Sequence, residues 1–494
     1  METLEAKPVN IEEFEQSSML QELFRGARIG PTDGATYAIV HQGLSVLARH
    51  AADHSEDCVR IDVPMVDRVI AEIDQRISAQ VNEILHAPAF QAIESAWRGL
   101  KFLVDRVDFR ENIEVEVANL SKAALQEDFE ESPERTKSGL YRMVYSSEFG
   151  THGGKPYGLI VANYQFGPGA QDLELLADCG AVAAMAHAPM ISNVGPEMFG
   201  ARSFVEVPRL RDIRSLLDGP QYARWRSLRD SEDARYLGLC MPRFLLRQPY
   251  DEVERPSRTF VFNEDTMGHH DRYLWGHASL AFASRVAESF ARYRWCPNII
   301  GPKSGGEVQG LPLHHYKALG ELQTKVSTEV LISERREFEL SEEGFISLVF
   351  RKGADNACFF SANSVQRPKV FARDADGAAA ETNFRLGTQL PYMFIVTRLA
   401  HYLKVLQREQ LGSWKERSDL ERELNRWLSQ YVADMESPAP GVRSRKPLRQ
   451  ATVGVEDVPG QPGWYRCNLK VRPHFKYMGA SFTLSLVGKL DREA

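Results

Sequence analysis

The feature that most constrains the fold lies near the carboxyl end, where polar and apolar residues alternate in two short segments on either side of Pro473. The apolar positions are Tyr465, Cys467, Leu469 and Val471 in the first segment and Phe482, Leu484 and Leu486 in the second. A period of two predicts a β-hairpin over residues 463–488. Because a two-stranded hairpin is only marginally stable alone in water, it must join a larger sheet, either in its own domain or in another chain.

A stretch rich in proline, glycine and basic residues precedes this hairpin. It spans residues 436–462 and includes Pro438, Pro440, Gly441 and Pro447. We expect no regular structure there, because proline lacks the backbone N–H that helices and sheets use. We call this flexible segment the leash. A terminal hairpin attached through it is suited to strand pairing between subunits, and the seven apolar positions of the hairpin are the candidate residues for that pairing. Pairing inside one domain is the alternative.

Length and composition limit the class of protein. A chain of 494 residues exceeds the roughly 250–300 residues over which one hydrophobic core keeps growing, so two or three lobes are expected. Hydrophobic residues make up 43% and charged residues 26%, which argues against a disordered, fibrous or membrane protein. The formal net charge is −7 and no long run carries one sign, which disfavours nucleic acid as the main partner.

The cysteines and the amino terminus indicate a cellular compartment. The six cysteines lie far apart without a CxxC pair, so neither a disulfide framework nor a zinc knuckle is predicted. A reducing cytoplasm suits such cysteines. The first residues contain no apolar segment of the signal-peptide type, and no stretch approaches the ~18 apolar residues that span a bilayer. We therefore expect a cytoplasmic protein without membrane insertion.

Hydrophobic periodicity divides the chain into three regions. In residues 1–60 the spacing predicts a short amphipathic helix over Ile11–Phe24, which either packs on its own domain or detaches for recognition by a partner. Residues 61–390 alternate helices and strands, and residues 391–494 contain two helices, the leash and the hairpin. The helix that begins near Pro391 ends before Gly412.

The middle region predicts the fold class. Helical spacing predicts an antiparallel helix pair over residues 66–104, followed by a strand over 113–117 and an acid-rich loop over 126–138. The order of strand, alanine-rich helix and strand between residues 157 and 194 predicts a β-α-β unit. The expected fold is therefore α/β, with α+β character, in which mixed sheets are flanked by helices.

Two glycine-containing loops lie where ligands often bind. Gly301–Gly306 follows an apolar run as a P-loop does, but Pro302 stands where a P-loop has glycine before its lysine. Since proline has no amide hydrogen for a phosphate, a tight turn explains this loop better. Phe166–Gly169 lies between a predicted strand and helix, yet it lacks the GxGxxG spacing.

Histidine pairs and a charged cluster complete the chemical candidates. His269–His270 and His314–His315 lack the spacing of metal ligands, since adjacent residues rarely share one ion. Glu334–Glu337 is interpreted as internal ion pairing or a subunit contact. No nucleophile stands with a base at a suitable spacing, so no catalytic, cofactor-binding or metal-binding residue is predicted. The alternative is an α/β enzyme that uses the Phe166–Gly169 loop or the histidines.

Several stretches resemble the large sheath subunit of the bacterial type VI secretion system, the TssC/VipB family. They are WRGLKFLV (Trp97–Val104), GGKPYGLIVANYQF (Gly153–Phe166), AAMAHAPMIS (Ala183–Ser192), FLLRQPYD (Phe244–Asp251), DRYLWGHASLAFA (Asp271–Ala283), STEVLISERREFEL with GFISLVFRK (Ser327–Lys352), LPYMFIVTRLAHYLK (Leu390–Lys404) and the terminal hairpin. These stretches occur along the chain in the same order as in members of the family. The resemblance implies a multi-lobed contractile-sheath fold and a structural role.

The resemblance also implies partners. A sheath of this family contains a small subunit (TssB/VipA-like) and many copies of the large one, forms a helical tubule on a baseplate around an Hcp-like inner tube, and contracts to propel that tube. The hairpin matches the element that pairs with strands of adjacent small subunits. A ClpV-like AAA+ unfoldase recycles contracted sheath through an N-terminal helix, for which Leu20, Leu23 and Phe24 are the proposed anchors here. A phage-type tail sheath that works alone is the alternative.

Overall fold

The computed structural model describes residues 38–39, 42–43, 46 and 63–486, except for 253–259, 267–268, 319, 370, 372–374, 414, 436–437, 461–463 and 475–481. The chain divides into two compact units. One takes in residues up to Ala87 together with Pro249–Gly268, and the other takes in Pro88–Gln248 and His269–Ala494. The predicted helix Ile11–Phe24, with Leu20, Leu23 and Phe24, lies outside the described residues.

Two amphipathic helices form where the sequence predicted a helix pair. The first unit contains α4 (Val63–His86), and the second unit begins with α5 (Pro88–Val104). Because the two helices belong to different units, their antiparallel pairing stays a prediction.

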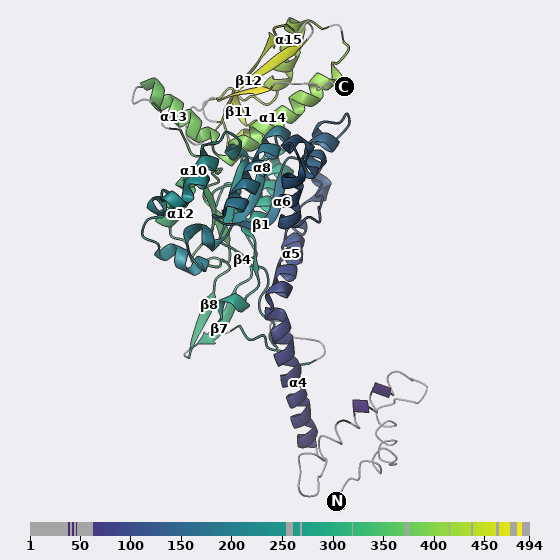
Figure 1. Cartoon of the computed structure of the whole chain (residues 1–494), viewed down its shortest axis with the longest axis vertical. Coiled ribbons are helices and arrows are strands. Elements are labelled where there is room, and N and C mark those ends of the chain that lie inside the picture. Colours follow the sequence, from purple (N-terminus) through teal and green to yellow (C-terminus); the bar gives the residue numbers. More distant parts are fainter. Residues whose placement is uncertain are drawn as a thin grey trace, which may run out of the picture. The chain divides into compact units, whose positions relative to one another are not determined.

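A six-stranded sheet lies at the centre of the second unit (Figure 1). Its strands, in spatial order, are β1 (Ile160–Phe166), β2 (Met190–Val194), β3 (Leu237–Met241), β9 (Phe345–Phe350), β10 (Ala357–Phe359) and β6 (Glu307–Val308). The first four run parallel, and β10 runs antiparallel to both of its neighbours. β1 and β2 are joined by α8 (Ala170–Ala186), which confirms the predicted β-α-β unit and the mixed α/β class.

Successive residues of the central strands face two different cores. Leu239 of β3 packs in the core on the α8 side, together with Leu176. The next residue, Cys240, packs in the core on the side of α11 (Ala278–Tyr293), together with Phe282. Helices therefore cover both faces, which explains why these strands carry apolar residues on both faces and not only on alternate positions.

Small residues allow the layers to approach closely. A Cβ at Gly180 of α8 would lie 3.1 Å from Leu237 Cδ1. A Cβ at Gly238 of β3 would lie 2.7 Å from Ile191 Cδ1 and 2.9 Å from Leu390 Cδ1. The alanine-rich helix therefore sits tightly against the sheet, as its composition predicts.

One helix joins the central sheet to a second sheet at the carboxyl end. α14 (Leu390–Glu409) buries Leu390 and Phe394 in the core on the α11 side, and Leu399 and Leu403 in a separate core under the C-terminal sheet. The C-terminal sheet is antiparallel and has the order β11 (Leu448–Asp457), β12 (Tyr465–Pro473) and β13 (Phe482–Leu486), with α15 (Arg417–Ser429) also packed on it. β12 and β13 confirm the predicted hairpin.

Shorter elements surround these sheets. They are the helices α6 (Lys122–Glu131), α7 (Gly139–Tyr141), α9 (Ile213–Leu217), α10 (Ala223–Asp230), α12 (Glu334–Glu342), α13 (Ala375–Gly387) and α16 (Pro440–Arg445), a π-helix over Arg142–Phe149, and 3-10 turns at Phe109–Glu111, Arg135–Lys137, Pro196–Phe199, Phe204–Arg209, Pro220–Tyr222, Asp233–Tyr236 and His270–Arg272. Two ribbons pair β4 (Phe244–Leu245) with β5 (Trp275–Gly276), and β7 (His314–Ala318) with β8 (Glu321–Lys325).

The expectation of an irregular leash over 436–462 is wrong. α16 and β11 lie inside that range. Pro440 stands in the first turn of α16, where a missing N–H does no harm, and Pro447 precedes β11. The prolines therefore mark the starts of regular elements. The predicted region boundaries at residues 60 and 390 stay a prediction.

Two expectations for the segment after α5 are also wrong. Residues 113–117 form no strand; Ile113 and Val115 pack instead against the small core that contains Leu103. Much of the expected loop over 126–138 is helical, because α6 begins at the N-cap Ser121, whose hydroxyl accepts a hydrogen bond from the Ala124 amide at 3.1 Å.

A buried histidine, His401, and a half-buried one, His187, lie where the end of α8 meets α14. His187 Nδ1 lies 3.3 Å from the Tyr236 hydroxyl, and His401 Nε2 donates to the Ala186 carbonyl at 3.0 Å. Burial lowers the pKa of His187 to about 3 and that of His401 to about 4, and the nearby Lys404 ammonium disfavours protonation further. Both rings are therefore neutral near neutral pH.

We expect these histidines to make the fold sensitive to acid. Histidines in the unfolded chain take up protons below about pH 6.5. Since the buried rings do not do so until about pH 4, the unfolded state binds more protons in that window and stability falls as the pH falls. The melting temperature should therefore drop between about pH 7 and about pH 5. His401→Gln keeps a donor for Ala186 but cannot titrate, so it should reduce the slope; an unchanged slope would contradict this account.

Candidate subunit interfaces

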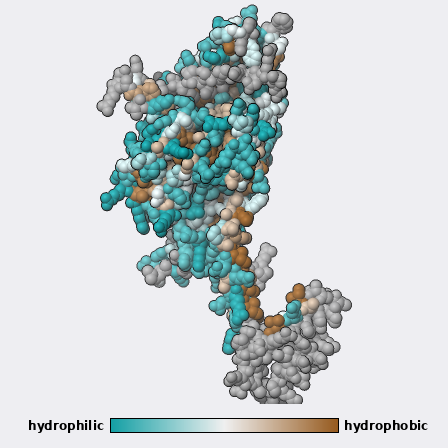
Figure 2. Space-filling model, viewed as in Figure 1, coloured by the Kyte–Doolittle hydropathy of each residue, from teal (hydrophilic) through white to brown (hydrophobic). Residues whose placement is uncertain are grey.

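A stripe of isoleucines runs along α4, and the described residues of its unit leave it partly exposed. Ile70, Ile73, Ile77 and Ile84 are between 39% and 50% exposed. Their spacing of three, four and seven residues places them on one side of the helix, as in the seam of a coiled coil. Figure 2 shows apolar side chains along this helix at the surface. We call these four residues the isoleucine stripe.

Another side of α4 is covered within the same unit. Ser78 donates to the Val261 carbonyl at 3.5 Å, and Asn82 Oδ1 accepts from the Asp265 amide at 3.1 Å. His86 Nε2 lies 3.4 Å from the Glu264 carboxylate. Successive members of this set are spaced four residues apart, so Ser78, Asn82 and His86 lie on one face of the helix. That face is well away from the isoleucine stripe. The covered face is polar and the uncovered one is apolar, the reverse of a helix that packs only on its own domain.

In the second unit, α5 also exposes large apolar side chains. Its buried side packs on α11, where a Cβ at Gly99 would lie 2.6 Å from Leu280 Cδ1. Its exposed side chains are Phe90, Ile93, Trp97 and Val104, with Trp97 at 69%. The sequence analysis missed this exposure and that of the isoleucine stripe, although the spacing of three, four and seven residues was a readable signal.

The predicted strand-pairing residues of β12 lie in the middle of a complete sheet. β12 pairs with β11 on one side and with β13 on the other, so its backbone has no free edge. Cys467, Leu469 and Val471 are buried in the core under the sheet, and Tyr465 packs at its margin. An added strand therefore has to use the outer edge of β11 or of β13.

The outer edge of β11 is partly closed by its own chain. The Asn425 side chain of α15 donates to the Val453 carbonyl at 2.7 Å and accepts from the Val453 amide at 2.9 Å. The Leu448 carbonyl accepts from the Ala433 amide at 2.8 Å, and the Leu448 amide donates to the Tyr431 carbonyl at 3.3 Å. β13, which contains Phe482, Leu484 and Leu486, is the edge strand on the other side among the described strands.

The glycine loops bind parts of their own chain. In the turn Gly301–Gly306, the amides of Ser304 and Gly306 donate to the Gly301 carbonyl at 3.2 and 3.0 Å, and Gly301 and Gly305 adopt positive φ. In Phe166–Gly169, the Gly167 amide donates to Asp172 Oδ2 at 2.7 Å. The first loop is the expected tight turn, and neither loop directs these amides outward to a ligand.

The histidine pairs contact separate partners. His270 Nε2 lies 3.2 Å from Glu329 Oε1, His314 Nδ1 lies 2.9 Å from the Tyr273 hydroxyl, and His315 Nδ1 lies 2.9 Å from the Thr324 hydroxyl. Within the described ranges, no group of three or more histidine, cysteine or acidic side chains is placed to hold a metal ion. The absence of a cofactor stays a prediction.

Two matched regions decide the family. A VipB family model described as the EvpB/VC_A0108 tail sheath N-terminal domain matches residues 67–366, and one described as the tail sheath gpW/gp25-like domain matches residues 379–490. The chain belongs to the VipB tail sheath family. It is also 39% identical over 456 residues, 91% of each chain, to the type VI secretion system sheath protein TssC1 of Pseudomonas aeruginosa.

Membership of the VipB tail sheath family confirms the resemblance read from the sequence and the role of a structural sheath protein. The alternatives of an α/β enzyme and of a phage-type sheath are not favoured. None of the helices in the described ranges is long and apolar enough to cross a bilayer. The cytoplasmic location and the lack of catalysis stay predictions.

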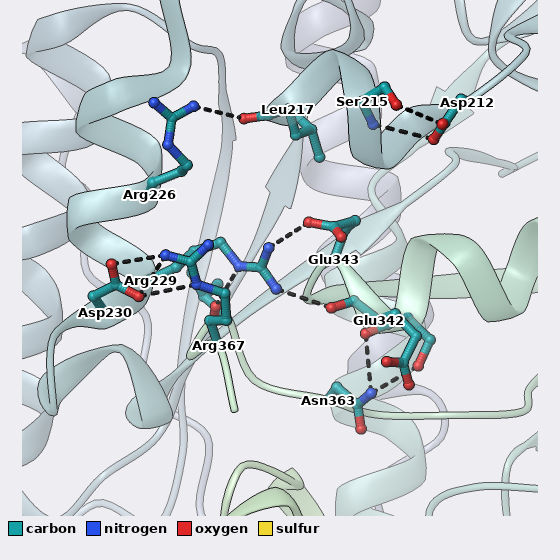
Figure 3. Close-up of polar contacts among 12 residues, drawn as sticks. Asp212, Ser215, Leu217, Arg226, Arg229, Asp230, Glu342, Glu343, Asn363 and Arg367 are labelled. Atoms are coloured by element: carbon teal, nitrogen blue, oxygen red, sulfur yellow. Dashed lines mark hydrogen bonds and ion pairs between the residues drawn. The ribbon is translucent and has the colours of Figure 1, made fainter. Parts of the chain in front are cut away.

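Buried ion pairs stiffen this sheath subunit, and the sequence analysis did not find them. Arg229, only 4% exposed, pairs with Glu343 and donates to the carbonyls of Val365 at 3.1 Å and Glu342 at 2.9 Å (Figure 3). It thereby ties α10 to the end of α12 and to the segment that follows β10. Beside it, Arg367 forms a bidentate pair with Asp230 at 2.8 Å in a more exposed position.

A second buried carboxylate lies at the ends of β4 and β8. Glu329 accepts two hydrogen bonds of 2.8 Å from Arg243 and contacts His270 at 3.2 Å. Burial opposes its charge, but the hydrogen bonds from Arg243 and His270 hold the pKa of Glu329 below its ordinary value. The Glu334–Glu337 cluster also pairs internally, because Arg335 and Arg336 both contact Glu339. Such pairs hold the lobe rigid.

Proposed function

We propose that this chain is the large subunit of a type VI secretion sheath, which binds a small sheath subunit and further copies of itself to form a contractile helical tubule. The isoleucine stripe is the observation that carries the proposal, since a chain that worked alone would cover it. The TssC1 relative, which is similar over 91% of its length, supports the same conclusion. The sheath assembles on a baseplate, and its contraction drives an Hcp-like inner tube outward.

The small subunit contributes an amphipathic helix to the isoleucine stripe. Isoleucines at spacings of three and four residues form the knobs of a coiled-coil seam, and they require an apolar helix opposite them. Fully burying an exposed isoleucine contributes about 1.5–3 kcal/mol, and these four are between 39% and 50% exposed, so each adds roughly 1 kcal/mol when a partner covers it. The exposed residues of α5 provide a second apolar surface in the other unit.

Strand pairing between subunits uses the edge of β13. Phe482, Leu484 and Leu486 keep the role expected of them, whereas Tyr465, Cys467, Leu469 and Val471 support the sheet from its central strand. Backbone hydrogen bonds to a donated strand survive rotation of the lobes, so a lattice can shorten without coming apart. Recycling by a ClpV-like unfoldase through Leu20, Leu23 and Phe24 belongs to the same proposal and rests on the resemblance to the family.

Co-expression with the small sheath subunit encoded nearby tests this function. We expect tubules in electron micrographs and poor solubility of the large subunit when it is produced alone. A chain that lacks residues 475–494 loses β13 but keeps β12 paired with β11, so it should fold, bind the small subunit and form no long tubules. Soluble monomers that ignore the partner would refute the function, and normal tubules from the shortened chain would refute strand pairing at β13.

A further inference from the structure

One segment of the second unit is rich in exposed arginines. The segment over residues 201–226 contains six arginines and three carboxylates, although the whole chain has a formal net charge of −7. Its exposed arginines are Arg202, Arg209, Arg211, Arg214 and Arg224, none of which forms an ion pair with a residue that the structure describes. We call these five residues the arginine face.

The backbone that carries the arginine face is held from two sides. Arg226 of α10 donates to the carbonyls of Leu217 at 3.3 Å and Gly219 at 2.6 Å (Figure 3). Arg336 of α12 donates to the Pro208 carbonyl at 3.3 Å and also to that of Leu210. Residues 208–219 are thus clamped between two helices, which presents their other side chains in a fixed arrangement.

The carboxylates of the 201–226 segment, Glu206, Asp212 and Asp218, are only half as many as its arginines. Asp212 caps α9, accepting from the Ser215 amide at 3.1 Å and from its hydroxyl (Figure 3). A hollow of about 170 Å³ is lined by Arg211, Arg335, Arg336 and Glu339. Glu339 already forms ion pairs with Arg335 and Arg336, so it does not neutralise Arg211. The surface therefore keeps an excess of positive charge.

A matching acidic surface lies on α6 and the residues that follow it. Residues 123–134 contain no basic side chain. Glu127, Glu130, Glu131 and Glu134 are exposed and form no ion pair within the described ranges. Asp128 of the same helix is not counted with them, because its carboxylate accepts a hydrogen bond from the Gly139 amide at 2.8 Å. We call the four glutamates the acidic face.

The two faces of one copy are kept apart. α8 packs against α6 on one side and against α10 on the other, and Figure 1 shows it between them. A rigid lobe therefore carries unbalanced charges of opposite sign at two places that its own fold does not bring together. Complementary patches at different places on one molecule suit contact between successive copies.

We propose that the acidic face of one copy docks on the arginine face of the next copy in the sheath. The contact is head-to-tail, so it produces an open row of lobes instead of a closed dimer. Exposed ion pairs are individually weak, but guanidinium groups bind carboxylates with two hydrogen bonds, and the array repeats at every subunit. The proposal rests on the sheath function and adds a contact between large subunits that salt should weaken.

Charge reversal with a compensating swap tests the contact in full-length chains co-expressed with the small subunit. We expect R209E/R211E/R214E and E127K/E130K/E131K each to lower tubule yield about tenfold or more, because like charges then face each other. Combining both sets should restore much of the yield. R209K/R211K/R214K keeps the charge and is the matched control, which should assemble. Sedimentation and electron microscopy measure the yield.

Several outcomes would overturn the proposal. Unchanged yield after either reversal excludes that face from the contact, and a combined variant no better than the single sets excludes their pairing. If a triple variant fails to fold, Arg211→Glu with Glu130→Lys provides a smaller pair for the same comparison. Absence of tubules from the unaltered chain would instead refute the sheath function itself, so the two failures are distinguishable.

Discussion

Replacing Ile73 and Ile77 with aspartate should abolish binding of the small sheath subunit while the large subunit stays folded. The two side chains lie in the isoleucine stripe and are 46% and 39% exposed, and neither belongs to a buried core among the described residues. Since less than half of each side chain remains to be buried in the complex, each loses roughly 1 kcal/mol of burial, and each aspartate adds the cost of a charge in an apolar seam. Affinity should fall by about a hundredfold or more. Co-purification and a binding titration measure the loss.

The matched control lies on the same helix. Gln75 and Ala79 are exposed on the side of α4 away from the stripe, so Q75D/A79D adds the same two charges without touching the seam. This variant should bind the small subunit normally. Equal binding by I73D/I77D and the unaltered chain would show that the small subunit docks elsewhere.

Replacing Arg229 with alanine should destabilise the second unit by about 3–5 kcal/mol, because the carboxylate of Glu343 is left buried without its partner. Two backbone carbonyls also lose their donors, those of Val365 and Glu342. A drop of this size removes a large part of the stability of an ordinary domain. Denaturant unfolding of the purified complex with the small subunit, followed by fluorescence, measures the change.

Arg367→Ala is the control for this prediction. Arg367 also makes a bidentate pair with an aspartate, but its side chain is 40% exposed and that of Asp230 is 56% exposed. Water replaces a lost partner at such a site, so we expect a change of only about 0–1 kcal/mol. Equal losses in the two variants would mean that burial does not decide the strength of these pairs.

Local sequence patterns predicted some of the regular elements. The β-α-β unit, α14 and the pair β12–β13 form where spacing and caps placed them. Such signals act over a few residues, through the period of the backbone and the first or last turn of a helix. The candidate site was predicted only in part: the hairpin was found, but the isoleucine stripe, the arginine face and the buried Arg229 pair were not.

The sequence by itself determined the family, the α/β class and the terminal hairpin, because each depends on residues close together in the chain or on long similar stretches. Only the tertiary structure decided which surfaces are covered. Val471 and Ile73 both occupy apolar positions in periodic patterns, yet one is buried under a sheet and the other is exposed. The difference arises from segments distant in sequence, such as β11, which makes β12 a central strand and leaves β13 at the edge.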